Sequence, residues 1–452
     1  MFRYAQHDSA EIPLQSGTAM TVTRYFRFRR VITCLPETDP IPDAAVLVEG
    51  GRITAVGSAT RVPVPAGAEV VDHSDATAMP GLIDAHVHLM YRSGESIFDH
   101  AQAFDDHDLL VRAAHHARLL LQAGVTTVRD CGSRGTFLRA LRDGINAGSL
   151  PGPRLLVCGP PITTSAGHLW VCGGEADTAD DARRAVRRLV KEGVDFIKVM
   201  ATGGRMTPGT NVGRAQYSAE ELRAIVEDAH RLGRPVAAHC LGTEGITAAV
   251  EAGVDTIEHG NWLDETGDGV AFDEAVARRM AEHGIYRNMA TQPDRELAGL
   301  SPDAPLTTPQ QRRLEVAQER WRWFREGIAL GVPSFFSTDA IFGQWGDACT
   351  DLPWLTVLVG ERSGIDPLDA LRMVTAIPAQ ALGLASEAGT IAPGRRADLL
   401  VLRGDPLDSL RSLLDVEAVY KDGAAGTSPR HGRMRDDVPS RSRDSRLDVA
   451  VD

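Results

Sequence analysis

The sequence of 452 residues lacks the features that mark membrane, secreted and disulfide-stabilised proteins. No run of about 18 apolar residues is present, which predicts that no helix spans a membrane. The first 30 residues lack the apolar segment of a secretory signal, and Met20 is an alternative start to Met1. The six cysteines form no CxxC pair and are expected to be free thiols. Together these absences predict a cytoplasmic protein.

Positive charge is also scarce, because 48 lysines and arginines stand against 61 aspartates and glutamates, for a net charge of −13. Nucleic-acid-binding domains usually carry a basic surface, and anionic lipid attracts basic segments. The sequence therefore predicts neither nucleic acid nor membrane as a partner, and a small molecule is the expected substrate. A composition that is 43% hydrophobic and 24% charged is typical of a globular protein with a large core.

What is present is a regular alternation of strand and helix patterns. Two short β-rich runs, residues 45–50 and 52–57, predict a hairpin because a single glycine separates them. Eight strand patterns then alternate with helical ones, which predicts a (β/α)8 barrel, with a doubly wound sheet as the alternative. The expected strands are residues 81–88, 125–130, 154–158, 195–201, 235–240, 256–260, 285–290 and 333–340. Short strands return at residues 389–407 and 416–423 and are expected to complete the N-terminal β-module.

Ionisable side chains gather at the carboxyl ends of five expected strands, where barrel active sites are built. These residues are His86, His88, Lys198, His239, His259 and Asp339. Each alone could be a structural residue, but six such groups at one end of a barrel predict a metal site, since imidazole and carboxylate suit Zn²⁺ and similar ions. A lysine can join such a set if CO₂ converts it to a carbamate, and burial favours the uncharged amine that this reaction needs.

Five motifs in order resemble the amidohydrolase superfamily: PGLIDAHVHL (80–89), FIKVMATGG (196–204), AAHC (237–240), IEHG (257–260) and STDA (337–340). The resemblance extends over about residues 40–425. It implies an α/β fold, a (β/α)8 TIM-like barrel with a flanking β-sandwich built from both chain ends. With composition, it divides the chain into a disordered extension (1–30), the sandwich (31–77 and 389–425), the barrel (78–388) and a mobile polar tail (426–452).

The resemblance also implies a binuclear metal centre. His86, His88 and Asp339 would hold one divalent ion, and His239 and His259 the other. Lys198, as a CO₂-derived carbamate, would bridge them. Zinc is the expected metal, and Co²⁺ and Mn²⁺ also suit these ligands. A hydroxide between the ions would attack an amide-type C–N bond, with Asp339 moving the proton.

Within the superfamily, the sequence is most similar to the branch of imidazolonepropionase-like and prolidase-type enzymes, whose neighbours include ochratoxin-type amidases and phenylurea and thiocarbamate hydrolases. This implies that His168 contacts substrate and takes part in catalysis, and that Tyr217 binds a substrate carboxylate or carbonyl. Arg205 is a candidate partner for an anionic substrate. The resemblance further implies a homo-oligomer.

The segment 341–355 departs from the dipeptidases of that branch, because it is aromatic and contains Trp345 and Trp354. With Met289, Gln292 and Trp170 it predicts an apolar pocket. The first hypothesis is therefore an amide, urea or carbamate hydrolase. A Xaa-Pro-type dipeptidase or N-acyl amino acid hydrolase is the alternative, followed by a phosphotriester or lactone hydrolase. A non-catalytic scaffold is disfavoured because no ligand is lost, and Lys198 disfavours a one-metal deaminase.

Overall fold

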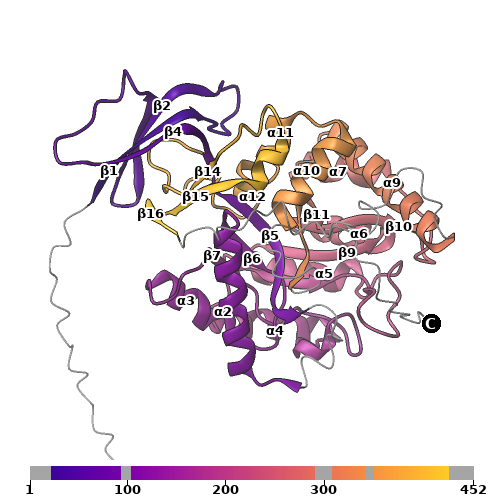
Figure 1. Ribbon diagram of the computed structural model, residues 1–452. Coiled ribbons are helices and arrows are strands. Elements are labelled where there is room, and N and C mark those ends of the chain that lie inside the picture. The colour runs from indigo at the N-terminus through magenta and orange to yellow at the C-terminus, as the bar shows by residue number, and fades with distance from the viewer. Residues whose placement is uncertain (1–21, 93–102, 291–307, 343–350, 427–452) are drawn as a thin grey trace, which may run out of the picture.

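The computed structural model describes residues 22–92, 103–290, 308–342 and 351–426 (Figure 1). Three hydrogen-bonded sheets organise these residues: one of seven strands, one of five and one of four. No described helix is long and apolar enough to cross a membrane. The five cysteines in the described part are buried and free, as expected, and Cys349 lies outside it.

The seven-stranded sheet unites both ends of the chain, in the order β16-β15-β14-β4-β1-β2-β3. Its strands are β1 (Thr23–Val31), β2 (Ile41–Glu49), β3 (Arg52–Ser58), β4 (Glu69–Pro80), β14 (Leu399–Leu402), β15 (Val416–Lys421) and β16 (Ala424–Ala425). The expected hairpin is confirmed, because β2 and β3 pair antiparallel across Gly50 and Gly51. Gly51 is required there, since its φ is +80° and a Cβ would lie 2.9 Å from the Asp422 carbonyl oxygen.

The expectation of disorder through residue 30 is wrong for residues 23–30. They form most of β1, which pairs with β2 on one side and β4 on the other. Phe26 and Phe28 are buried in the sheet's core while the intervening Arg27 is exposed, the alternation of a half-buried strand. Apolar burial thus orders this segment, and residues 1–21 lie outside the described part.

Eight parallel strands, each followed by helical segments, form most of the remaining described residues. The strands are β5 (Leu82–Arg92), β6 (Val125–Asp130), β7 (Arg154–Val157), β8 (Ile197–Met200), β9 (Val236–Gly242), β10 (Thr256–Leu263), β11 (Tyr286–Ala290) and β12 (Ser334–Ser337), with the short β13 (Ala340–Phe342) after them. The helices are α2 (Asp106–Gln122), α3 (Leu138–Asn146), α4 (Ala179–Lys191), α5 (Ala219–Arg231), α6 (Thr243–Ala252), α7 (Glu274–His283), α9 (Thr308–Ala329), α10 (Asp351–Ser363), α11 (Pro367–Arg372) and α12 (Ala376–Ala381), with 3₁₀ turns η1 (Trp170–Cys172) and η2 (Leu410–Leu414).

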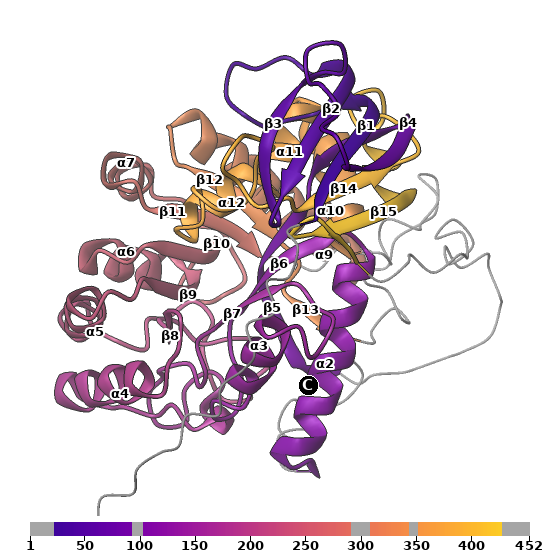
Figure 2. The same cartoon turned by 90° about the vertical axis from the view of Figure 1, so that its left-hand side faces the viewer.

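The strands are ordered around the barrel as they follow one another in the chain. Strands β5 to β7 form one sheet with β13, and β8 to β12 form the other. Figure 2 shows α4, α5, α6 and α7 in a row outside β8, β9, β10 and β11. The capping box that opens α5 is confirmed, with the Ser218 and Glu221 side chains each bound to the other's backbone.

The four-stranded and five-stranded sheets are connected by backbone hydrogen bonds at two places. At one, the Ile162 backbone N–H donates to the Lys198 carbonyl at 2.8 Å and the Met200 N–H to the Ile162 carbonyl at 2.8 Å. At the other, the Asp339 N–H donates to the His86 carbonyl at 2.9 Å, and Ala340 pairs with Val87. The ring of parallel strands is thereby connected on both sides, and the carboxyl ends of all eight strands lie at one end of it.

Candidate metal centre

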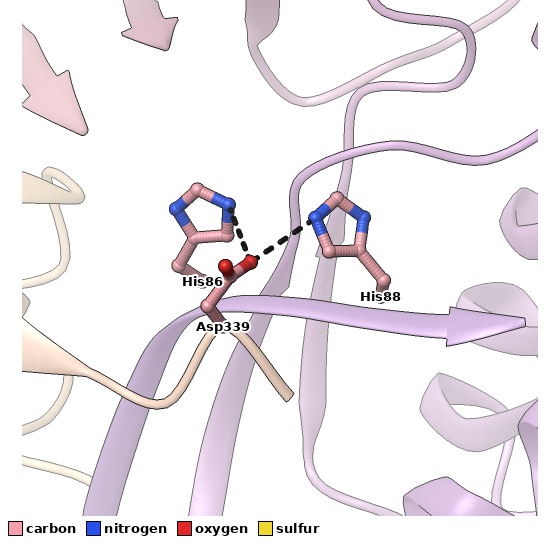
Figure 3. A group of neighbouring side chains, drawn as sticks. All are labelled: His86, His88 and Asp339. Carbon is pink, nitrogen blue, oxygen red and sulfur yellow. Dashed lines mark ion pairs between the residues drawn. The ribbon is translucent and has the colours of Figure 1, made fainter. Parts of the chain in front are cut away.

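Three of the expected ligands meet at the first and last barrel strands (Figure 3). His86 and His88 lie two residues apart on β5, so their rings share a face of the strand. The Nε2 atom of each lies 3.5 Å from Oδ1 of Asp339. Their ligand atoms all fall within 4.8 Å of one another, close enough to hold one metal ion.

The backbone places Asp339 between those rings through a turn that leaves the strand. Asp339 has a φ of +50°, in the left-handed region that few residues other than glycine adopt. The turn is held by Asp84 on β5, which accepts a hydrogen bond from the Thr338 hydroxyl at 2.6 Å and another from its N–H at 3.2 Å. A buried carboxylate on strand one therefore positions the aspartate at the end of strand eight.

The other three expected ligands lie beside the first three. The His259 ring centroid is 5.1 Å from that of His86 and 4.7 Å from that of His239. Lys198 lines the same cavity and is fully buried, and its Nζ has no hydrogen-bond partner among the described residues. A buried amine without a partner is costly, and a carbamate on this atom would supply the oxygen ligands that a metal pair requires. The donor set thus fits two divalent ions.

The second nitrogen of each histidine identifies the nitrogen left for a metal. Nδ1 of His88 donates to the Gly132 carbonyl at 3.2 Å, and Nδ1 of His259 to the Ala290 carbonyl at 2.9 Å. Their Nε2 atoms therefore keep the lone pair. His239 is reversed, because Nε2 lies 3.2 Å from the Gly203 carbonyl, which leaves Nδ1 as its ligand atom.

Burial and mutual charge put these groups in the protonation states that bind metals. Burial lowers the pKa of His86 to about 3, with Lys198 adding to the effect. Burial likewise lowers the pKa of His259, and lowers that of His239 well below its usual value. Burial alone would raise the pKa of Asp339, but the surrounding histidines outweigh it and lower that pKa. Neutral imidazoles and an ionised carboxylate result.

His168 and Arg205 lie where the sequence predicts substrate-contacting residues. Both line a cavity of about 300 Å³ that the six expected ligands also line. The His168 ring lies 4.6 Å from that of His239, and its Nδ1 lies 2.8 Å from the Thr207 hydroxyl. Burial lowers the pKa of His168 to about 3, so this ring too is neutral.

Two expectations about the pocket do not match the structure. Tyr217 does not line this cavity, because its buried hydroxyl donates to the Ala176 carbonyl at 2.7 Å and its ring packs in the core beside that residue. Trp354 packs against the core from α10, with the Arg411 guanidinium over its ring, and it too is absent from the lining. Gln292 and Trp345 lie outside the described residues. Met289 is buried in the core and Trp170 is partly exposed on η1.

Sequence reasoning missed other residues that line this cavity or support it. Tyr91, Asn261 and Arg320 belong to its wall. Glu258, Arg129 and Asn288 form a buried hydrogen-bonded group behind His86. A signal for the latter was available, because charged or amide residues inside the apolar strands TIEHG and YRNMA need partners when buried.

A family model described as "Amidohydrolase family" matches residues 77–425. The chain belongs to this family. Membership confirms the resemblance drawn from the five motifs, the (β/α)8 fold with its flanking sheet, and the assignment as a hydrolase of amide-type C–N bonds. Enzymes of this family carry a divalent metal centre and act on small molecules, which agrees with the geometry of the cavity.

Individual relatives cover most of the chain. Ochratoxinase of Aspergillus niger is 29% identical over 435 residues, which cover 88% of this chain and 86% of that protein. Imidazolonepropionase of Anaeromyxobacter sp. (strain K) is 27% identical over 421 residues, covering 84% and 90%. A crystal structure of a Xaa-Pro dipeptidase with methionine bound in the active site is similar with a TM-score of 0.75 and 27% identity, covering 89% and 99%.

Proposed function

We propose that this amidohydrolase is a binuclear zinc enzyme, carboxylated on Lys198, that cleaves an amide-type bond in a small substrate bearing a carboxylate. The observation that carries the binuclear centre is the convergence in one cavity of four histidines, Asp339 and the Lys198 amine, for which the described part of the chain offers no hydrogen-bond partner. A cytoplasmic location and a homo-oligomeric state stay predictions from the sequence.

The bound metals would polarise the scissile carbonyl and make hydroxide available near neutral pH. The remaining work belongs to the chain's own side chains. Asp339 is ionised, and its carboxylate lies 3.5 Å from Nε2 of His86 and of His88, where it can accept a proton and return it to the leaving nitrogen. His168 is neutral and held by Thr207, so its other ring nitrogen can donate to or accept from the substrate.

The cavity wall supports a carboxylate-bearing substrate. Arg205 and Arg320 both line it, and Asp339 is the only acidic side chain among its described lining residues. Two guanidinium groups in a protein with net charge −13 are suited to binding an anion. The dipeptidase structure, which holds methionine in its active site, agrees with this reading because methionine carries a carboxylate next to an apolar side chain.

The two-metal centre can be tested at Lys198. Lys198→Ala removes the bridging group, so we expect the bound metal to fall from about two ions per chain to one or fewer, with partial recovery on addition of a short carboxylic acid. Lys191→Ala, on the exposed side of α4, is the matched control and should keep both ions. Elemental analysis of the dialysed proteins makes the measurement, and two tightly held ions in Lys198→Ala would contradict the bridge.

The substrate class can be tested with a divided panel of compounds on the metal-loaded enzyme. One half holds dipeptides and N-acyl amino acids, and the other holds uncharged anilides, aryl ureas and carbamates. We expect turnover in the first half, and about a tenfold loss or more of kcat/KM in Arg205→Gln through KM, since one charge-assisted hydrogen bond contributes about 1.5–3 kcal/mol. Arg223→Gln, at an exposed site on α5, should leave kcat/KM unchanged. Turnover confined to the uncharged compounds would contradict the proposal that the substrate carries a carboxylate.

A further inference from the structure

Glu258 is a fully buried carboxylate that lies directly behind the metal-binding group. It is on β10, and it accepts hydrogen bonds from side chains on three other barrel strands as well as its own. The donors are His86 on β5, Arg129 on β6, Asn288 on β11 and Thr256 on β10. All four are themselves at least nine-tenths buried, so water does not compete for the carboxylate.

The two oxygens of Glu258 have different partners. Oε1 accepts from Arg129 and from the Thr256 hydroxyl, which lies at 2.7 Å. Oε2 accepts from Nδ1 of His86 and from the Asn288 amide, each at 2.7 Å. A carboxylate offers about four lone-pair positions, so the acceptor capacity of this group is filled.

This arrangement determines the tautomer of His86. The Arg129 guanidinium forms an ion pair with Oε1 of Glu258, and the Asn288 amide nitrogen, which only donates, occupies Oε2 beside His86. An ionised carboxylate only accepts, so Nδ1 of His86 must carry the hydrogen. The lone pair is then on Nε2, the atom that faces Asp339 at 3.5 Å.

His86 differs in this respect from its neighbours. His88 and His259 are oriented by main-chain carbonyls, which the fold supplies whatever the side chains are. His86 depends on a side chain. If Glu258 served only to pair with Arg129, its contacts through Oε1 with Arg129 and Thr256 would be sufficient. Its other oxygen, Oε2, instead accepts from both His86 and Asn288, and the Asn288 hydrogen bond fixes the orientation of Oε2 toward His86.

We propose that Glu258 is a positioning residue that fixes the Nδ1-protonated tautomer of His86 and so directs its Nε2 to the metal shared with His88 and Asp339. Arg129 and Asn288 hold the carboxylate in place for this purpose. The inference rests on the proposed metal centre, but it concerns only the ion at His86, His88 and Asp339.

The tautomer can be measured without any change to Glu258. The metal-free enzyme is labelled with ¹⁵N-histidine, and the His86 signals are assigned by their loss in His86→Gln. We expect a protonated Nδ1 and an unprotonated Nε2 for His86 at pH 7.5. A spectrum with the hydrogen on Nε2, or an even mixture of both tautomers, would overturn the proposal.

The consequence for the metal is measured with Glu258→Gln. An amide cannot accept from His86, Asn288, Arg129 and Thr256 together, and loss of such a supporting group typically weakens metal affinity about 10–100-fold. We expect competition with a chelator to remove one ion from Glu258→Gln at correspondingly lower chelator concentration, and the second ion as in the wild type. Asp228→Asn is the matched control, because this buried carboxylate binds Arg187 and Arg231 and, within the described residues, forms no hydrogen bond or ion pair with a histidine.

The two proposals fail in different ways. If the wild type binds a single ion and Lys198→Ala binds the same amount of metal, the proposal of a binuclear centre is wrong. The His86 tautomer and the ion at His86 would then still be tested as described. A folded Glu258→Gln that keeps every ion at wild-type affinity would overturn the role of Glu258 alone. Should Glu258→Gln not fold, Asn288→Leu removes one donor that holds the same oxygen, and an unaltered affinity for the ion in that variant would count against the proposal.

Discussion

At the scale of the residue, Asp339 combines a strained backbone with a central position among the ligands. Asparagine also tolerates the left-handed region and keeps one oxygen for a metal, so Asp339→Asn should preserve the turn at φ +50°. It loses the ability to accept a proton. We therefore expect a fall in kcat of about 10²-fold or more, with metal content close to wild type.

The measurement compares kcat and bound metal in the same preparations. A variant that lost its metal would report on ligation only, which is why both readouts are needed. Near-wild-type turnover with two ions bound would mean that another group moves the proton, and would remove the role assigned to Asp339.

The six expected metal ligands stand out in the sequence by their position, whereas the residues that support them give only the weaker signal of a polar side chain in an apolar strand. His86, His88, Lys198, His239, His259 and Asp339 end strands at one side of a barrel, a pattern that packing needs do not produce. Glu258 carries no such signature, because its partners come from three other strands. Tyr217 matches a family position that binds substrate, yet here its hydroxyl donates a hydrogen bond to the Ala176 carbonyl inside the core.

At the scale of the element, the strand and helix patterns were predictable because they are local. Strand β6 spans the expected residues 125–130, and α5 begins at its capping box. The eighth strand is less regular than expected, since Thr338 and Asp339 leave the ladder between β12 and β13. The cause is a contact distant in sequence, because Thr338 donates two hydrogen bonds to the Asp84 carboxylate on the first barrel strand.

Tertiary burial also accounts for two further misjudged segments. Residues 23–30 are rich in arginine, yet alternate phenylalanines face the core of the seven-stranded sheet. Trp354 belongs to α10 and packs on the core rather than in the cavity. In both cases the deciding contact comes from an element distant in sequence, which periodicity does not report.

At the scale of the whole molecule, the seven-stranded sheet and the barrel are linked by the covalent chain and also by a hydrogen bond and an ion pair. Gly81, between β4 and β5, donates its N–H to the Asp398 carbonyl at 2.9 Å. The Asp398 carboxylate in turn accepts from Arg154 on β7 at 2.8 Å and is nearly buried. A buried pair of this kind is costly to break on one side, so the two parts are expected to support one another's stability.

The stability of the metal-free enzyme should fall as pH falls below neutrality, because buried histidines must gain protons on unfolding. Burial lowers the pKa of His86 and of His168 to about 3, and lowers those of His239 and His259 as well. In the unfolded chain each titrates near 6.5. Between about pH 6.5 and 3 the unfolded state therefore binds more protons, and the free energy of unfolding drops by up to about 1.4 kcal/mol per pH unit for each such histidine.

One buried acid opposes this trend. Burial raises the pKa of Asp130 to about 6, so between its unfolded value near 4 and about pH 6 the folded state binds the extra proton and gains stability as pH falls. The net fall in the free energy of unfolding near pH 5 should thus be smaller than the histidines alone would give. Urea unfolding of chelator-treated enzyme at pH 7.5, 6.5, 5.5 and 5.0 measures it, and His168→Gln should reduce the slope by about one proton. A free energy of unfolding that stayed constant from pH 7.5 to 5.0 would mean that these rings are already charged in the folded protein. The protonation states assigned to the metal centre would then be wrong.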